Sequence, residues 1–327
     1  MMFVSVTSHA RLHLGFYNIL SDGVAYGSIG VAIDHPVTSV SVRDAESSRV
    51  VNVSGVYVDD VINEVLSRFN DVAVELRIEE AIPRHVGLGS TTQLVLSTGC
   101  ALSKILGTPC DARKLALIFR RGRISGIGIA AFERGGFIVD SGRRVRDGVI
   151  EEPKSINDIP QVIFRHPLPR SWCFIVVIPK GVRGLDERAE REFLDVPYEP
   201  PEELQDELRR TLILHLLPSI TRRDAEVFGK SITRIQELVG RYFSRYQGGI
   251  YCCDETECAV RSLLRNGAYG AGQSSWGPTA YGVVCGYRRA LKVLEGVKRD
   301  LSRRGIEAAY YIVRAKNRGA TVRVESS

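Results

Sequence analysis

The chain has 327 residues, a 44% hydrophobic content and a formal net charge of +6 at neutral pH. This length accommodates two domains, and the composition is ordinary for a globular protein. No apolar run approaches the ~20 residues that a membrane-spanning helix needs, and the first residues lack the pattern of a signal peptide. We therefore expect a cytoplasmic protein without a membrane partner.

The basic residues are dispersed along the chain, where 44 Lys and Arg face 38 Asp and Glu. A modest, dispersed excess suits a protein that binds anionic small molecules, and it also permits weak nonspecific binding to nucleic acid. No block of like charges is long enough to form a basic tail. Arg is more frequent than Lys, and Asn, Gln and Met are all scarce. This composition weakly favours a thermophilic source organism.

The predicted elements mix strands and helices without regular alternation, which indicates an α+β fold. Alternating or β-branched runs predict strands at residues 3–7, 30–42, 50–58, 72–79, 135–140, 172–178, 308–315 and 320–325. Helical patterns cover residues 59–70, 90–106, 111–121, 201–217, 224–245 and 288–303. Residues 147–170 are rich in proline and polar residues, so we place the domain boundary there, between 1–165 and 166–327.

A glycine loop opens directly into the helix that is predicted from residue 90. Gly87 and Gly89 allow a tight turn and close approach of a ligand. Ser90 followed by Gln93 predicts a capping box. Free N–H groups and the helix dipole make such a helix start an anion site. The alternative is a capped helix after a turn, because glycine loops are common.

Arg11 and His13 follow the first predicted strand and are expected on one face of it, with Leu12 on the other. The fork-shaped donors of Arg11 suit a phosphate or carboxylate, and His13 suits hydrogen bonding to substrate or proton transfer. The alternative is a charged pair on a solvated face. 

A third segment, residues 270–278, combines polar side chains with a flat ring. Gln273, Ser274 and Ser275 supply hydrogen-bond donors and acceptors. Trp276 offers a face on which an aromatic ligand can stack, with core packing as the alternative.

Other polar clusters have simpler interpretations. Cys252, Cys253 and Cys258 lie close in sequence without CxxC spacing or a neighbouring His, so packing or helix-end roles are favoured over a metal site. A disulfide is the further alternative in a hyperthermophile. Glu255 and Glu257 are expected in a polar loop, although carboxylates there could bind Mg²⁺. Residues 317–319 predict a hairpin turn between the last two strands.

Four segments together resemble one branch of the galactokinase–homoserine kinase–mevalonate kinase (GHMP) superfamily. They are residues 10–16, 83–93, 125–136 and 270–278. The second reads Pro-x-x-x-Gly-Leu-Gly-Ser-Thr and resembles the phosphate loop of the superfamily. The set resembles the β-ribofuranosylaminobenzene 5′-phosphate synthase family. That resemblance implies a GHMP-kinase-like two-domain fold, with a left-handed βαβ unit in the N-terminal domain, a ferredoxin-like C-terminal domain and a ligand cleft between them.

The same segments depart from the kinases of the superfamily. Those kinases often carry an Asp near the phosphoryl acceptor where this chain has Gly128. The missing carboxylate argues against kinase chemistry, although Asp140 and Glu133 are alternative bases nearby in sequence. In the third loop, Gln273, Ser274 and Ser275 replace the glycines that are typical of the kinases.

The resemblance implies transfer of the phosphoribosyl group of phosphoribosyl diphosphate to 4-aminobenzoate, or to a related 4-substituted benzoate. CO₂ and diphosphate would be released, in archaeal methanopterin biosynthesis. Mg²⁺ is the implied cofactor, with ligands that remain unknown. We expect a homodimer with no nucleic-acid partner. The rival functions are an ATP-dependent small-molecule kinase and a nucleic-acid-binding protein, and the latter predicts a basic stripe with interleaved aromatic residues.

The site residues that follow from this resemblance fall into two groups. The expected catalytic residues are Arg11, His13, Arg134 and Gln273. The expected substrate-binding residues are Gly87, Leu88, Gly89, Ser90, Thr91, Thr92, Ser125, Ser274, Ser275 and Trp276.

Overall fold

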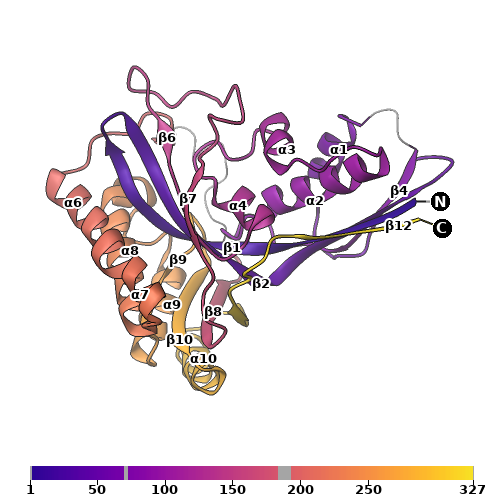
Figure 1. Ribbon diagram of the computed structural model, residues 1–327. Helices are drawn as coiled ribbons and strands as arrows, with labels where there is room; N and C mark the ends of the chain where they lie inside the picture. Colours follow the sequence, from indigo (N-terminus) through magenta and orange to yellow (C-terminus); the bar gives the residue numbers. More distant parts are fainter. Residues whose placement is uncertain (1, 70–72, 183–192, 327) are drawn as a thin grey trace.

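The computed structural model describes residues 2–69, 73–182 and 193–326. Two β-sheets form the framework, and helices cover them (Figure 1). No helix in the described part of the chain is long and apolar enough to cross a membrane. The architecture is the expected mixed α+β fold.

The largest feature is a hairpin of two long strands, β1 (Met2–Ser21) and β2 (Val24–Asp44). Asp22 and Gly23 join them with φ angles of 52° and 71°, as a two-residue hairpin turn with two left-handed residues requires. The sequence-based strands at 3–7 and 30–42 were therefore too short. Three irregularities in the pairing of β1 with β2 interrupt the ladder around Arg11 and His13. Such bulges re-aim side chains within a strand.

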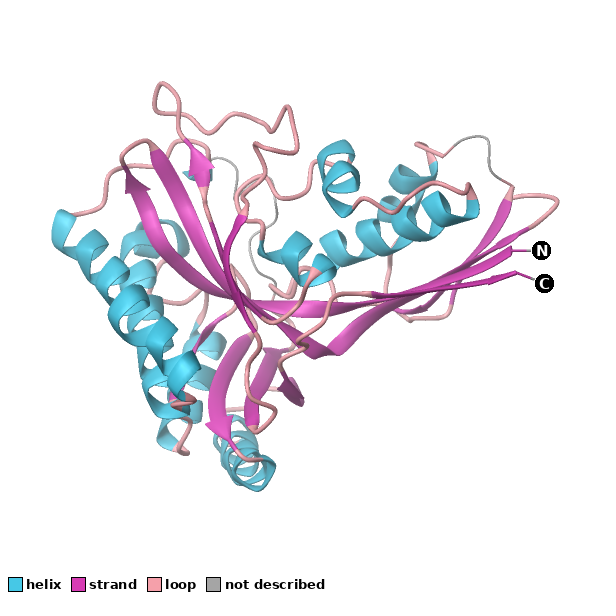
Figure 2. Ribbon diagram, viewed as in Figure 1, coloured by secondary structure: helices cyan, strands magenta, loops and turns pink. Residues whose placement is uncertain are grey.

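The hairpin belongs to the eight-stranded sheet, whose main path runs β12-β1-β2-β4-β3. Its other strands are β3 (Arg49–Asn52), β4 (Val74–Glu80), β5 (Phe137–Asp140), β6 (Arg143–Arg144), β7 (Val162–His166) and β12 (Thr321–Ser326). One face is covered by α1 (Asp59–Leu66), α2 (Ser90–Ile105), α3 (Ala112–Ile118) and α4 (Ile127–Glu133) (Figures 1 and 2). β3 and β4 pair in parallel and α1 connects them, which is a βαβ unit.

The second sheet is antiparallel and four-stranded, in the order β11-β8-β10-β9. Its strands are β8 (Trp172–Pro179), β9 (Gly270–Gln273), β10 (Ala280–Cys285) and β11 (Ala308–Arg314). The helical segments described in this half of the chain are α6 (Glu202–Arg210), the π-helix η1 (Thr211–Leu216), α7 (Leu217–Arg222), α8 (Ala225–Gln247), α9 (Asp254–Arg265) and α10 (Tyr287–Ser302).

The two halves of the chain share one hydrophobic cluster. It contains Leu12 and Phe16 from β1 together with Trp172 from β8 and Phe228 from α8. A second cluster, with Val4, Val40 and Leu102 among its members, lies between α2 and the far part of the hairpin. The proposed division at residue 165 stays a prediction.

Three local predictions were wrong. Residues 317–319 do not close a hairpin, because β11 pairs with β8 while β12 pairs with β1 in the other sheet. Glu255 and Glu257 lie in the first turn of α9 and not in a polar loop. Ser90 makes no capping box, since α2 is capped by Gly89 and the Gln93 amide donates to the Gly128 carbonyl at 2.8 Å.

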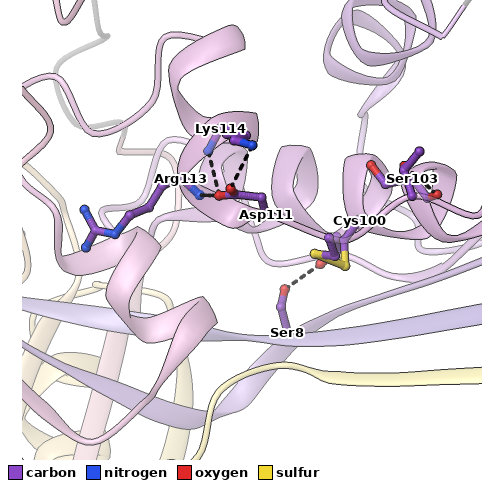
Figure 3. The surroundings of a disulfide bond; sticks show 9 residues. Ser8, Cys100, Ser103, Asp111, Arg113 and Lys114 are labelled. Carbon is purple, nitrogen blue, oxygen red and sulfur yellow. Dashed lines mark hydrogen bonds and ion pairs between the residues drawn. A yellow bond between two sulfur atoms is a disulfide. The ribbon is translucent and has the colours of Figure 1, made fainter. Parts of the chain in front are cut away.

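A disulfide between Cys100 and Cys110 ties the end of α2 to the start of α3 (Figure 3). The sequence did not predict this bond. Asp111 follows it and caps α3 by accepting from the N–H groups of Arg113 and Lys114. Cys252, Cys253 and Cys258 are free thiols, and no group of metal-binding side chains is present among the described residues.

Candidate active site

The two glycine loops meet, although about 190 residues separate them in sequence. The Ser274 hydroxyl donates to the Gly87 carbonyl at 2.7 Å and accepts from the His13 N–H at 3.0 Å. A Cβ added at Gly87 would lie 2.2 Å from the Ser274 carbonyl oxygen. Gly87 also has a φ of +84°, so both its backbone conformation and the contact require glycine.

Arg11 joins this junction from the bulged part of β1. Its N–H donates to the Leu88 carbonyl at 3.1 Å, and its guanidinium donates to the Gly87 carbonyl. A Cβ at Gly89 would lie 3.3 Å from the Arg11 side chain. The arginine is therefore held against the start of α2, where the helix dipole also favours an anion.

A cavity of about 200 Å³ opens beside the junction. It lies between β1, the start of α2, the connection from α3 to α4, helix α8 and the 273–276 loop. Its lining comprises Arg11, His13, Gly15, Phe16, Thr92, Arg120, Arg121, Gly122, Arg123, Ile124, Ser125, Leu194, Gln236, Val239, Gly240, Phe243, Gln247, Ile250, Gln273, Ser275 and Trp276.

Four arginines contribute to the cavity lining and are here called the basic wall, namely Arg11, Arg120, Arg121 and Arg123. Arg123 forms ion pairs with Glu152 and Asp195 outside the cavity lining. Among the described residues no Asp or Glu lines the cavity. Several guanidinium groups around a described lining that holds no carboxylate favour phosphate or carboxylate ligands.

Three aromatic residues of the lining, here called the aromatic wall, are Phe16, Phe243 and Trp276. Trp276 is only 8% exposed, and its ring packs edge-on against Phe243 at 4.7 Å between centroids. It makes a similar contact with Phe193 at 5.0 Å. The sequence left two interpretations of Trp276 open, packing in the core and contact with a ligand. The structure places the residue in the hydrophobic core and also in the lining of the cavity.

His13 also lines the cavity, is nearly buried, and has its ring 5.0 Å from the ring of Phe16. Burial, together with the positive charge of Arg11, lowers the pKa of His13 to about 3. Its imidazole is consequently neutral near pH 7, with one nitrogen able to donate and the other able to accept. His13 can hydrogen-bond a substrate at this place, and it adds no positive charge.

The side-chain amides of Gln273 and Gln236, which line the cavity, form hydrogen bonds with the backbone of neighbouring segments. Gln273 accepts from the Cys252 N–H at 2.7 Å and donates to the Ser275 carbonyl at 2.8 Å. Gln236 donates to the Leu14 carbonyl at 2.8 Å and accepts from the Gln273 N–H at 2.9 Å. These bonds fix the 273–276 loop against β1 and α8.

Asp140 supports the cavity from behind and does not line it. Its buried carboxylate accepts from the N–H groups of Ser28, Gly126 and Gly142, and its second oxygen lies 3.4 Å from the Ser125 hydroxyl. Burial raises the pKa of Asp140 to about 6 despite these hydrogen bonds. Its role in the fold is to fix the turn that leads into α4.

Comparison with known proteins identifies the family. Residues 56–136 match the N-terminal domain of the GHMP kinases. The chain is 30% identical to the beta-ribofuranosylphenol 5′-phosphate synthase of Methanothermobacter thermautotrophicus, covering 85% of this chain and 88% of that protein. It is 27% identical to the synthase of the same name from Archaeoglobus fulgidus, over 96% and 98% of the two chains.

The chain belongs to the β-ribofuranosylphenol 5′-phosphate synthase family. It is thus an enzyme of the same kind as the family expected from the four sequence segments. Solved structures show the same fold: a homoserine kinase from Cytophaga hutchinsonii has a TM-score of 0.71 at 17% identity, over 98% of this chain and 97% of that one. The L. major mevalonate kinase in complex with R-mevalonate has a TM-score of 0.67 at 14% identity, over 95% and 96%.

The synthase cavity brings together part of the expected site. Seven of the expected residues line it, namely Arg11, His13, Thr92, Ser125, Gln273, Ser275 and Trp276. Others lie behind the lining, namely Gly87, Leu88, Gly89, Ser90, Thr91 and Ser274. Arg134 ends α4 outside the lining, and its carbonyl accepts from Arg165. The catalytic and binding roles of these residues stay predictions.

Sequence reasoning missed the connection from α3 to α4, although it supplies three arginines to the basic wall. The run Arg-Arg-Gly-Arg at residues 120–123 is a visible signal, directly before the recognised segment at 125. Gln236 and Gln247 of α8 carried no comparable signal, because nothing in their spacing distinguishes them from other polar helix residues.

Proposed function

We propose that this synthase transfers the phosphoribosyl group of phosphoribosyl diphosphate to the ring of a 4-substituted benzoate and releases CO₂ and diphosphate. The acceptor is 4-aminobenzoate or its hydroxyl analogue, and the relatives' names, which contain phenol, favour the hydroxyl. As further proposals, the product enters methanopterin biosynthesis in an archaeal cytoplasm, and the enzyme is a homodimer without a nucleic-acid partner.

The observation that carries this proposal is the pairing of the two cavity walls. One substrate is a polyphosphate and the other is a flat ring with a carboxylate. Four arginines of the lining match the anions, while Phe16, Phe243 and Trp276 of the same lining match the ring. The cavity lies beside the start of α2, and Thr92 of that helix adds a hydroxyl group to its lining.

The proposed step forms one bond and breaks two. The ring carbon that bears the carboxylate attacks C1 of the ribose, and the bond from C1 to the diphosphate oxygen breaks. The bond from the ring to the carboxylate then breaks, its electron pair restores the aromatic ring, and CO₂ leaves. Arg11 and its neighbours would stabilise the negative charge that grows on the leaving diphosphate, while the aromatic wall would orient the ring.

This step needs no general base, because the group that leaves the ring is CO₂ and not a proton. The cavity is consistent with that requirement. No carboxylate lines its described part, His13 is neutral and can only donate or accept a hydrogen bond, and Asp140 is held behind the lining. An acidic side chain beside C1 would also repel the benzoate and compete for the electron-poor carbon.

The described lining offers no carboxylate for Mg²⁺, which usually takes one or two from the protein. The cavity therefore does not fit a protein-held magnesium ion within the described residues. We propose that any Mg²⁺ enters on the oxygens of the diphosphate, and no step above depends on it.

The test is a coupled measurement of both products. Purified enzyme, phosphoribosyl diphosphate and Mg²⁺ are incubated with carboxyl-labelled 4-hydroxybenzoate or 4-aminobenzoate. We expect labelled CO₂ and diphosphate in a 1:1 ratio with at least one acceptor. Diphosphate release without CO₂, or neither product with either acceptor, would overturn the proposal.

The rival function is an ATP-dependent kinase, and Gly128 is the residue that speaks against it. The kinase carboxylate is absent there, and a Cβ added at this position would lie 3.3 Å from the Thr92 methyl group, so a larger side chain would press against Thr92. We expect no ADP formation with homoserine, mevalonate or a sugar. Turnover on the order of 1 to 1000 per second with any of them would establish a kinase.

A further inference from the structure

Five helices in the described part of the chain end with the same hydrogen-bond pattern. In each, one N–H bonds to the carbonyl three residues earlier, and the next N–H bonds to the carbonyl five residues earlier. The first of these residues has a positive φ in every case. This is the Schellman motif, in which glycine is preferred at the left-handed position because it has no Cβ. The five left-handed residues are Gly107, Gly267, Gly305, Arg120 and Arg223.

Arg120 and Arg223 thus occupy positions where the other three helices use glycine. Their φ angles are 52° and 57°, and both side chains are exposed. A residue with a Cβ is strained in this conformation. Arg223 ends α7 and does not line the cavity, whereas Arg120 ends α3 and lies in the basic wall.

The side chain of Arg120 is available to a ligand in the cavity. Within the described residues, no hydrogen bond or ion pair of the Arg120 side chain is present. Its neighbour Arg123 is by contrast engaged by Glu152 and Asp195. Ser275, which lines the same cavity, is also left-handed, with a φ of 55°. Strained residues of this kind cluster at ligand sites.

We propose that Arg120 binds a phosphoryl group of the donor substrate, and that its strained helix-end position serves to aim the guanidinium into the cavity. The inference rests on the proposed function, since it names a residue that holds the donor. The ligand chemistry is a phosphoryl oxygen that accepts from the planar fork of the guanidinium. Either the diphosphate or the 5′-phosphate supplies this oxygen, and the experiment separates the two.

The experiment compares Arg120→Gly with Arg223→Gly, because the two changes remove the same charge and the same backbone strain. Both variants should fold, and their unfolding temperatures should shift by a similar amount, because relief of backbone strain and the added freedom of glycine in the unfolded chain are the same in both. Binding of inorganic pyrophosphate and of ribose 5-phosphate is then measured by titration calorimetry. Arg223→Gly should bind both as the wild type does.

Arg120→Gly should bind at least one of the two probes about tenfold or more weakly. Weaker pyrophosphate binding assigns Arg120 to the diphosphate, and weaker ribose 5-phosphate binding assigns it to the 5′-phosphate. Arg120→Lys retains the charge and should recover most of the affinity.

Two results would overturn the inference alone: wild-type affinity of Arg120→Gly for both probes, or equal weakening by Arg120→Gly and Arg120→Lys, which would indicate a backbone effect. A wild-type enzyme that binds neither probe nor phosphoribosyl diphosphate would overturn the inference and the proposed donor together.

Discussion

The basic wall and the aromatic wall of the cavity are built in different ways. Arg120, Arg121 and Arg123 lie on a connection between two short helices, outside the hydrophobic clusters. Arg120 is exposed, whereas the side chain of Arg123 is only 10% exposed and forms ion pairs with Glu152 and Asp195. Phe16, Phe243 and Trp276 are buried members of the largest hydrophobic cluster. We therefore expect that the charge of Arg120 can change with little effect on the fold, whereas changes in the aromatic wall should alter substrate binding and stability together.

The largest effect is expected where the two walls are joined. Gly87→Ala would place a Cβ 2.2 Å from the Ser274 carbonyl and force the loops apart. We expect kcat/KM to fall at least about 100-fold and the free energy of unfolding to fall by about 2–4 kcal/mol, from strain and overpacking. Steady-state kinetics and denaturant unfolding measure the two quantities.

Gly89→Ala is the matched control for this prediction. Gly89 also has a positive φ, but its Cβ would meet only the Arg11 side chain, at 3.3 Å. This variant should be destabilised by about 1 kcal/mol and should lose donor affinity while the two loops stay joined. If Gly87→Ala and Gly89→Ala behave alike, the junction is not what couples the walls.

A smaller effect is expected for Trp276→Phe in the aromatic wall. The change removes part of a stacking surface, which costs roughly 0.5–1.5 kcal/mol, so the acceptor KM should rise several-fold with donor affinity nearly unchanged. Loss of core volume should also lower the free energy of unfolding by about 1–3 kcal/mol.

Trp172→Phe provides the comparison for Trp276→Phe. Trp172 is buried against Phe228 in the same cluster and does not line the cavity. It should lose similar stability without a change in acceptor KM. An unchanged acceptor KM in Trp276→Phe would show that this tryptophan only fills the core.

The last prediction concerns the buried His13 and its influence on stability at low pH, an effect that is absent near neutral pH. The pKa of His13 is about 3 in the folded state, below its ordinary value of 6.5. The unfolded chain therefore binds a proton between pH 6.5 and 3 that the folded chain does not. The free energy of unfolding falls as the pH is lowered through this window, by up to about 1.4 kcal/mol per pH unit.

His13→Gln should make that decline less steep, as measured by denaturant unfolding at several pH values. His9 contributes a similar decline, because burial lowers its pKa to about 4, so the difference between variant and wild type is the relevant quantity. The exposed His215 provides a control through His215→Gln. An identical pH dependence in His13→Gln and the wild type would contradict the buried, neutral state of His13.

Local signals in the sequence were sufficient for the glycine loop and most helices. Gly87 and Gly89 adjoin an apolar helix, so the turn before that helix could be predicted from the local pattern. The arginine run that contains Arg120 is visible in the sequence, but its place in the cavity depends on how α3 packs in the fold. Ser274 looked like a ligand group, but its hydroxyl bonds to Gly87, a partner 187 residues away that no local pattern identifies.

The same limit explains the errors in the strands. Asp22 and Gly23 form a turn that local chemistry supports, yet the full length of β1 depends on partners from both ends of the chain. Residues 317–319 have the composition of a hairpin turn, but their flanking strands find different partners. The composition of a turn predicts the local backbone conformation, but it does not predict which sheet the following strand joins.

The pairing of β12 with β1 imposes an order on biosynthesis. β1 is made first and β12 last, yet they lie side by side from Thr7 opposite Thr321 to Met2 opposite Ser326 (Figure 1). Until residue 326 has left the ribosome, one edge of β1 has no partner, and an open edge is a template for pairing with other chains. Successful folding of this enzyme thus depends on keeping nascent chains apart until the last strand arrives.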